Sequence, residues 1–271
     1  MKAGKMGSLL RKIIDNYNYV NIDLSDERTR DMYILTNPIL MTVFTILYYK
    51  LVTKWGPKYM QKREAFNVDK ILIVYNLLQI IICSVLSGIV IKDVYLSGYY
   101  SIVCQPITWG TSPMELDIMK YGKYYYYLKI ADLLDTVFFV LRKKNSQITF
   151  LHVYHHIVMI LLGFLSIKYI PAGHGAMIGT INCVVHAFMY AYYLLTAVSP
   201  EYKKSVWWKK HLTQLQLLQF VLLFIHFTHI LFRPSCTYPK WVSLSFLTQN
   251  STMIFMFSDF YYKNYIKVKK Q

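Results

Sequence analysis

Seven apolar segments recur along the chain, separated by short polar connections. They cover residues 33–53, 71–91, 124–141, 148–168, 174–198, 212–232 and 241–262. Backbone groups in lipid must be hydrogen-bonded internally, and a helix rising 1.5 Å per residue crosses about 30 Å of hydrocarbon over such lengths. We therefore predict an all-α membrane protein with seven transmembrane helices. An amino-terminal arm (1–32) precedes the seven-span domain (33–262), and a basic tail (263–271) follows it.

The composition agrees with a membrane protein. Apolar residues make up 55% of the 271 positions and charged residues only 16%, whereas soluble domains average about 45–50% and about 25%. In the arm, apolar residues recur at helical spacing at positions 9, 10, 13, 14 and 17. The arm is thus either a short amphipathic helix at the membrane surface or a frayed polar terminus.

Lysines and arginines are distributed unequally between the connections. Sixteen follow predicted spans one, three, five and seven, and six lie in the opposite connections. By the positive-inside rule the first set, including the carboxyl-terminal tail, is expected on the cytosolic side. Much of the net charge of +16 is then explained by the orientation of the chain in the membrane. The expected partner is therefore the lipid bilayer, and nucleic acid is not expected.

The four cysteines form no CxxC pair, which indicates neither a zinc module nor a disulfide scaffold. They are Cys83, Cys104, Cys183 and Cys236. Cys104 and Cys236 flank spans on the same predicted side, so a bridge between them stays open.

Three histidines lie in the fourth apolar segment, at His152, His155 and His156. Ionisable groups are costly in a membrane segment, so they mark a functional site by default. Five to nine residues into the span, they are expected about 8–14 Å from its cytosolic end. His152 and His156, four residues apart, share a helix face.

Further polar residues lie in the predicted cytosolic halves of other spans. The third span has Lys129, Asp132 and Asp135; the fifth has Asn182, His186, Tyr190 and Tyr193; the sixth has Gln214, Gln216 and Gln219. Lys129 is the expected ion-pair partner of Asp132, because the two are three residues apart on one helix face. We predict that these groups face the histidines across a shared substrate site.

Two chemistries suit such a histidine cluster. Neutral imidazoles ligate iron in membrane desaturases and hydroxylases, but those enzymes need several histidine boxes and only one HxxHH occurs here. The second chemistry is acyl transfer, with an imidazole as nucleophile or general base. We favour acyl transfer and predict no metal site. A di-iron oxidase and a seven-helix receptor or transporter are the alternatives.

An ordered series of motifs resembles the very-long-chain fatty acid elongases of the endoplasmic reticulum. The series runs through Lys129-Ile-Ala-Asp-Leu-Leu-Asp-Thr136, Phe138-Phe-Val-Leu-Arg-Lys-Lys144, Leu151-His-Val-Tyr-His-His156, Gly173-His-Gly175, Asn182 to His186, and Thr213-Gln-Leu-Gln-Leu-Leu-Gln-Phe220. Tyr75-Asn76 and Cys104-Gln-Pro106 extend it towards the amino terminus. Two departures are Asp132, where that family commonly has glutamate, and the segment 107–114.

The resemblance implies condensation of a long-chain acyl-CoA with malonyl-CoA to a 3-oxoacyl-CoA two carbons longer, with release of CO2 and CoA. It implies a seven-helix bundle around a narrow acyl tunnel, with the two substrates and no further cofactor. His155 would accept the acyl group with His186 assisting, and Cys183 is a rival nucleophile. His152 and His156 would orient the substrates, while Asn182, Gln216 and Gln219 would stabilise negative charge on oxygen.

Arg142, Lys143 and Lys144 are candidate contacts for the CoA phosphates. The resemblance also implies the endoplasmic reticulum membrane, with which the carboxyl-terminal Lys267-Val-Lys-Lys-Gln271 agrees as a KxKxx retrieval signal. The reductases and dehydratase of the elongation cycle, and a second copy of the chain, are the candidate protein partners.

Overall fold

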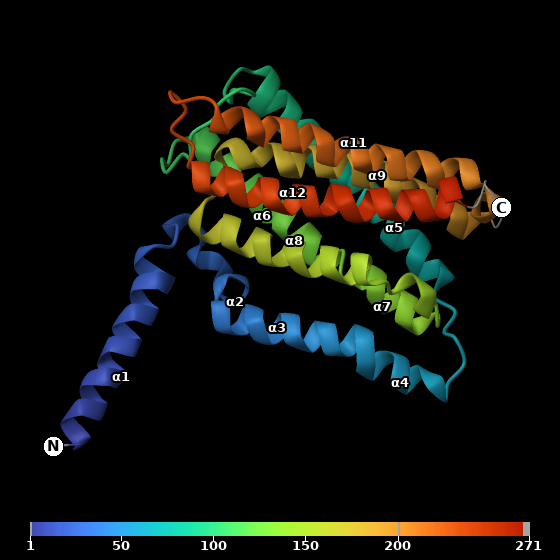
Figure 1. The fold of residues 1–271 in the computed structure, drawn as a ribbon, viewed down its shortest axis with the longest axis horizontal. Helices are drawn as coiled ribbons and strands as arrows, with labels where there is room; N and C mark the ends of the chain where they lie inside the picture. Colours follow the sequence, from blue (N-terminus) through green and yellow to red (C-terminus); the bar gives the residue numbers. More distant parts are fainter. Residues whose placement is uncertain (1, 200, 268–271) are drawn as a thin grey trace.

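Long helices lie side by side in the computed structural model of the chain, which describes residues 2–199 and 201–267 (Figure 1). The helices are α1 (Lys2–Asn18), α2 (Tyr33–Thr36), α3 (Pro38–Lys50), α4 (Gly56–Gln61), α5 (Asp69–Val90), α6 (Pro113–Ala131), α7 (Leu134–Leu141), α8 (Phe150–Tyr169), α9 (Ala176–Val198), α10 (Glu201–Lys204), α11 (Val206–Leu231) and α12 (Lys240–Tyr261). No strand occurs in these two ranges. The predicted all-α class is confirmed.

Five helical stretches are long and apolar enough to cross a membrane. They are Glu27–Gln61, Asp69–Leu96, Phe150–Tyr169, Gly173–Val198 and Val206–Leu231. The chain is therefore a multi-pass membrane protein. The predicted third and seventh spans correspond to α6–α7 and to α12, which lie beside the others (Figure 1) but do not belong to these five, so a total of seven spans stays a prediction.

The predicted third span, 124–141, is the one whose outline differs most from expectation. Its helix begins at Pro113, behind a capping box in which Ser112 and Glu115 bond each other's backbone amides. The sequence analysis missed this start because residues 113–123 include charged side chains, which lower the hydropathy of the segment. The helix ends at Ala131 and resumes at Leu134, because a tighter turn intervenes in which the Leu133 amide donates to the Ile130 carbonyl at 3.2 Å.

The connections gather at two opposite ends of the bundle (Figure 1). One, here called the basic end, has the connections 62–68 and 142–149 and helix α10. The other, here called the disulfide end, has 97–112, 170–175 and 232–239, and there a disulfide joins Cys104 to Cys236. The bridge that the sequence left open is thus present, while Cys83 and Cys183 are free and buried.

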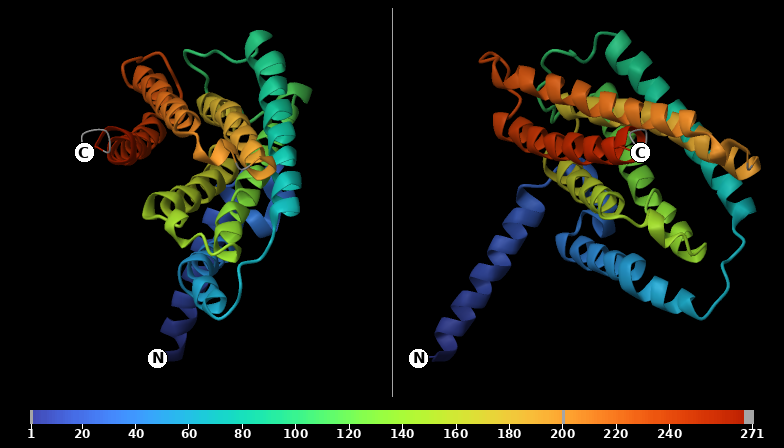
Figure 2. Two further views of the ribbon diagram at one scale, coloured as in Figure 1. Left: turned by 90° about the vertical axis from the view of Figure 1, so that its right-hand side faces the viewer. Right: turned by 45° about the vertical axis from the view of Figure 1, so that its right-hand side comes forward.

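Helix α9 lies inside the bundle, packed along α5 and in contact with α6 and α11 (Figure 2). Helix α12 packs along α11, and α6 along α8. At the α6–α8 crossing a Cβ on Gly163 would lie 2.8 Å from the Tyr126 ring, so this approach requires glycine. The buried residues Tyr126, Ile160 and Tyr190 form part of the resulting core.

The end of the arm is attached to the bundle at the disulfide end. The Asp26 amide donates to the Lys168 carbonyl at 2.8 Å, and Arg28 donates to the carbonyls of Thr108 and Gly110. Lys168 itself is buried and donates to the Thr36 carbonyl and to Asn21. Helix α1, in contrast, projects away from the other helices (Figures 1 and 2).

Candidate active site

A buried ion pair lies at the centre of the polar residues that the apolar segments contain. The Lys129 ammonium donates to Asp132 Oδ2 at 2.6 Å and to Asn182 Oδ1 at 2.8 Å, and both charged residues are almost fully buried. The predicted Lys129–Asp132 pair is confirmed. Since buried charges are costly unless paired and hydrogen-bonded, this cluster holds α6 and α9 in one register.

Two further residues of α9 complete the cluster. His186 Nδ1 lies 3.4 Å from Asp132 Oδ2 and 3.3 Å from Lys129 Nζ. One turn later, the Tyr190 hydroxyl lies 3.1 Å from Asp132 Oδ1 and 2.8 Å from Asp135 Oδ2. The two aspartates of the predicted third span are therefore connected through one tyrosine.

Helix α5 contributes a residue that the sequence analysis did not single out. Gln79 Nε2 donates to Asp132 Oδ1 at 3.0 Å and to the Tyr75 hydroxyl at 3.0 Å, and that hydroxyl lies 3.3 Å from Tyr190. The available signal was a glutamine one helical turn after Tyr75-Asn76 in a largely apolar helix. On α6, Tyr125 was missed as well; its hydroxyl donates to Asn182 Oδ1 at 3.2 Å.

His152 is held by a short chain of hydroxyl groups. The Tyr48 hydroxyl donates to Thr136 Oγ1 at 2.7 Å, and Thr136 Oγ1 lies 2.9 Å from His152 Nε2. Thr136 Oγ1 accepts from Tyr48 and still has its own proton, which it donates to His152 Nε2 in the tautomer that is protonated at Nδ1. The rings of His152 and His156 are 4.4 Å apart, so the predicted shared face is confirmed.

His155 has no such support. Within residues 2–199 and 201–267, the Nδ1 atom of His155 is fully buried and has no protein hydrogen-bond partner. An unsatisfied buried polar atom costs about 1–3 kcal/mol, so it calls for a functional explanation. Of the three histidines of the box, His155 is the one with a fully buried, unsatisfied ring nitrogen.

The four histidines line a cavity of about 730 Å³ that extends to the basic end, a volume in the range of small-molecule sites. Its wall there includes Arg142, Lys144 and Lys209. The cavity therefore offers positive charge near its end and imidazoles further inside.

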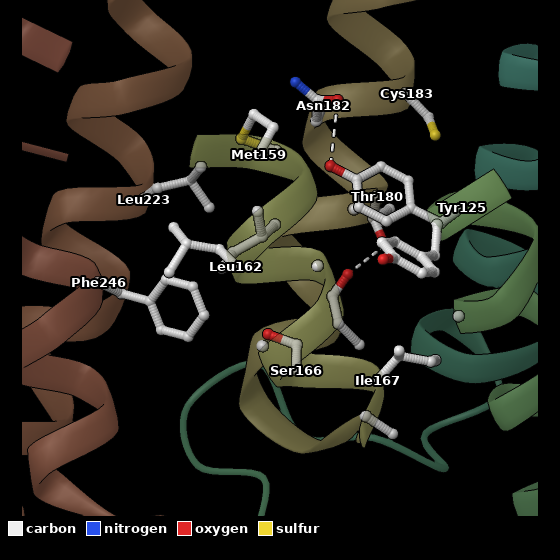
Figure 3. Close-up of a pocket in the computed structure, with 18 of the residues that line it drawn as sticks. Tyr125, Met159, Leu162, Ser166, Ile167, Thr180, Asn182, Cys183, Leu223 and Phe246 are labelled. Carbon is white, nitrogen blue, oxygen red and sulfur yellow. Dashed lines mark hydrogen bonds between the residues drawn. The ribbon is translucent and has the colours of Figure 1, made fainter. Parts of the chain in front are cut away.

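A narrower cavity of about 170 Å³ continues towards the disulfide end, where Ala172 and Tyr238 line it. Apolar side chains such as Met159, Leu162, Leu223 and Phe246 form most of its wall (Figure 3). The two cavities share four lining residues, which are His155, Asn182, Gln219 and Phe220. His155 thus lies where the more polar cavity meets an almost wholly apolar one, as the resemblance to a family with an acyl tunnel implies.

The remaining predicted residues divide into two groups. Asp135, Tyr193 and Gln216 line the wider cavity with the histidines, and Tyr193 also packs against the Tyr190 ring. Lys143 and Gln214 line neither cavity.

Lys129, Asp132 and Tyr190 also line neither cavity, because they bond one another in the buried cluster. Local geometry explains the other two residues. Lys143 has a positive φ of 54° and donates to the Arg63 carbonyl. Gln214 donates to the Tyr261 hydroxyl; it precedes Gln216 by two positions, which turns it about 200° around α11.

A model of the family described as ELO: GNS1/SUR4 family matches residues 33–271. The chain belongs to this family. A very long chain fatty acid elongase of Aedes aegypti is 34% identical over 268 residues, covering 97% of this chain and 74% of that protein. Very long chain fatty acid elongase 7 of Drosophila melanogaster is 36% identical over 259 residues, with 95% and 78% covered. Elongase 1 of Mus musculus is 36% identical over 250 residues, with 91% and 88% covered.

Two further histidines of this ELO-family chain lie at the disulfide end. His174 and His226 stack with ring centroids 3.6 Å apart, and each ring contacts the other residue's carbonyl oxygen. They hold the 170–175 connection against α11. In the described part of the chain, no three His, Cys, Asp or Glu side chains are arranged to hold a metal ion.

Proposed function

We propose that this ELO-family chain is the condensing enzyme of fatty acid elongation, an acyltransferase of the 3-oxoacyl-CoA synthase class. It joins a long-chain acyl-CoA to malonyl-CoA and needs no cofactor beyond these substrates. The names of its relatives support the reaction class. The observation that carries the proposal is His155, whose buried Nδ1 has no partner and whose ring lines both the wider and the narrower cavity.

The two cavities suit the two halves of an acyl-CoA. The CoA moiety occupies the wider cavity, where Arg142, Lys144 and Lys209 offer cations to its phosphates. The acyl chain enters the narrower cavity, whose apolar wall replaces water around the methylene groups. The thioester then lies beside His155.

In the first step, a ring nitrogen of His155 attacks the thioester carbonyl carbon. The carbon–sulfur bond breaks, the other ring nitrogen of His155 gives up its proton, and CoA leaves as the thiol. His186 assists the proton transfer, because its Nδ1 is held beside the Lys129–Asp132 pair, which orients the ring and leaves the other ring nitrogen to relay the proton. Asn182 and Gln219 stabilise the developing oxyanion with their amide N–H groups.

In the second step, malonyl-CoA replaces CoA and loses CO2. The electrons of the broken carbon–carbon bond form an enolate, which attacks the acyl carbon on His155. The carbon–nitrogen bond then breaks, and the released imidazole takes up a proton from water. His152 and His156 orient the malonyl thioester, with Thr136 holding the His152 ring. The product is a 3-oxoacyl-CoA two carbons longer.

The location that suits this reaction is the endoplasmic reticulum membrane, with the basic end and the carboxyl terminus in the cytosol. The Cys104–Cys236 bridge supports this orientation, because disulfides persist in the oxidising lumen. A reductase of the elongation cycle then takes the 3-oxo product at the basic end, and the dehydratase acts on the resulting 3-hydroxy compound. The retrieval signal in 267–271 falls mainly on residues outside the described ranges. Protease added to sealed microsomes should cut the basic end and leave the disulfide end intact.

The covalent route is tested with purified protein and acyl-CoA alone. We expect an intact-mass increase of one acyl group, absent in His155→Ala and present in the control His229→Ala, whose imidazole is exposed on α11 outside both cavities. Labelled malonyl-CoA is then added and chain extension is measured, with bound iron determined in parallel. Extension without an adduct would overturn the covalent route, and bound iron without extension would overturn the proposed function.

A further inference from the structure

Helix α1 has one apolar face that the rest of the protein leaves uncovered. Met6, Leu9, Leu10, Ile13, Ile14 and Tyr17 recur at helical spacing, and all six side chains are exposed, five of them by about half or more. At 100° per residue, Ser8, Arg11, Lys12 and Asp15 fall on the opposite face. The helix is thus amphipathic, and the frayed terminus considered from the sequence does not form.

The position of α1 relative to the membrane spans is informative. The helix leaves the bundle at the disulfide end and runs crosswise to the spans (Figures 1 and 2). Its attachment lies at its carboxyl end, where Tyr17 contacts Asn37 and the following Asn21 accepts from Lys168. Because the apolar surfaces of the spans end there, this path places α1 beside the headgroup layer.

An isolated helix of this kind is not stable by itself in water. Helix α1 is seventeen residues long, and isolated helices shorter than roughly 12–15 residues are only marginally stable in water. In proteins, helix stability comes mostly from burial of an apolar face. A membrane interface supplies that burial without any protein partner. The sequence of α1 contains four lysines and arginines and one aspartate, a balance that favours anionic headgroups.

We propose that α1 is an in-plane membrane anchor at the disulfide end, with its apolar face at the boundary between acyl chains and headgroups. Its basic residues face lipid phosphates. The anchor extends the contact between protein and membrane sideways from the bundle, so it limits tilting of the spans at that end. This role is independent of the proposed elongation chemistry.

The full-length protein in lipid nanodiscs tests the anchor. Ile13→Cys places a thiol on the apolar face, and Ser8→Cys is the matched control on the opposite face. An environment-sensitive maleimide fluorophore should label the introduced thiol selectively, because Cys83 and Cys183 are buried and Cys104 is bridged to Cys236. We expect the Ile13 label to be quenched several-fold more by lipids with shallow nitroxide groups than the Ser8 label.

Equal and weak quenching at both positions would overturn the proposal. Strong protection of the Ile13 label from water-soluble quencher without quenching by nitroxide lipid would indicate a protein occupant, such as a second copy, and would overturn it as well. In anionic nanodiscs, Arg11→Gln with Lys12→Gln should reduce nitroxide quenching at Ile13, whereas in neutral nanodiscs it should have little effect. If this double substitution leaves the quenching at Ile13 unchanged in both kinds of nanodisc, the role assigned to the basic residues is contradicted.

Discussion

The Tyr190 hydroxyl lies 2.8 Å from Asp135 Oδ2. The same hydroxyl lies 3.1 Å from Asp132 Oδ1, although a phenol has a single proton to donate. A second proton, on one of the two carboxyl groups, lets both contacts be full hydrogen bonds. Asp132 is the ionised partner of Lys129, which leaves the proton on Asp135.

This proton count distinguishes the two aspartates by mutation. Asp135→Asn replaces the protonated carboxyl with an amide that still donates to Tyr190. We therefore expect an elongation rate within about threefold of the wild-type rate, a smaller change than the loss of one hydrogen bond would cause. Asp132→Asn leaves Lys129 buried without its anion, a change that costs about 3–5 kcal/mol when a buried pair is broken. We expect at least a hundredfold loss of elongation and a lower melting temperature. Initial rates with labelled malonyl-CoA and thermal unfolding measure both, and equal losses would contradict the proton assignment.

Gln79 is expected to position Asp132 and, through it, His186. Gln79→Leu removes a hydrogen bond to a charged group, worth about 1.5–3 kcal/mol, so we expect kcat to fall at least tenfold with little change in the KM for acyl-CoA. The side chain of Gln79→Asn is one methylene shorter, so this variant should recover little of the lost kcat.

The matched control is Gln214→Leu, because Gln214 bonds Tyr261 outside both cavities. It should keep wild-type kinetics. A larger effect at Gln214 than at Gln79 would mean that the sequence-based assignment of Gln214 to the substrate site was right.

The length of the narrower cavity is expected to limit the acyl chain. Ser166 lines this cavity eleven residues after His155 on α8, about 16 Å further along the helix. Ser166→Phe should fill the cavity there, so that the longest accepted acyl-CoAs lose at least tenfold in rate while shorter ones keep theirs. The control is Leu165→Phe, whose side chain is exposed on the outside of the bundle. An unchanged product profile in Ser166→Phe would show that the acyl chain takes another path.

The bridge at the disulfide end predicts a defined thiol count. Denatured protein should react with a maleimide mass tag at two cysteines without reductant and at four after reduction. Since the bridge closes a separation of 132 residues, removing it should destabilise the protein by about 2–5 kcal/mol. Thermal unfolding of Cys104→Ser with Cys236→Ser measures this loss, and four tags without reductant would refute the bridge.

Relationships within one helix were predictable from the sequence. The Lys129–Asp132 pair and the shared face of His152 and His156 follow from helical spacing, which is the same in every helix. Apolar length likewise predicted the membrane spans, because lipid admits only internally hydrogen-bonded segments. The start of α6 was missed, since its first turns are polar and helix formation there depends on the Ser112 cap rather than on hydropathy.

Relationships between helices were decided by the tertiary structure. Gln79 is 53 residues from Asp132, and no spacing rule states which face of α5 turns towards α6. The same holds for α11, where Gln216 and Gln219 line the wider cavity while Gln214 faces Tyr261. Helix rotation and axial register are set by packing over the whole interface, as where Gly163 admits the Tyr126 ring. The sequence therefore determined that the chain crosses a membrane through apolar helices and that three histidines share one of them, and only the packing of the helices decided which polar side chains meet at His155.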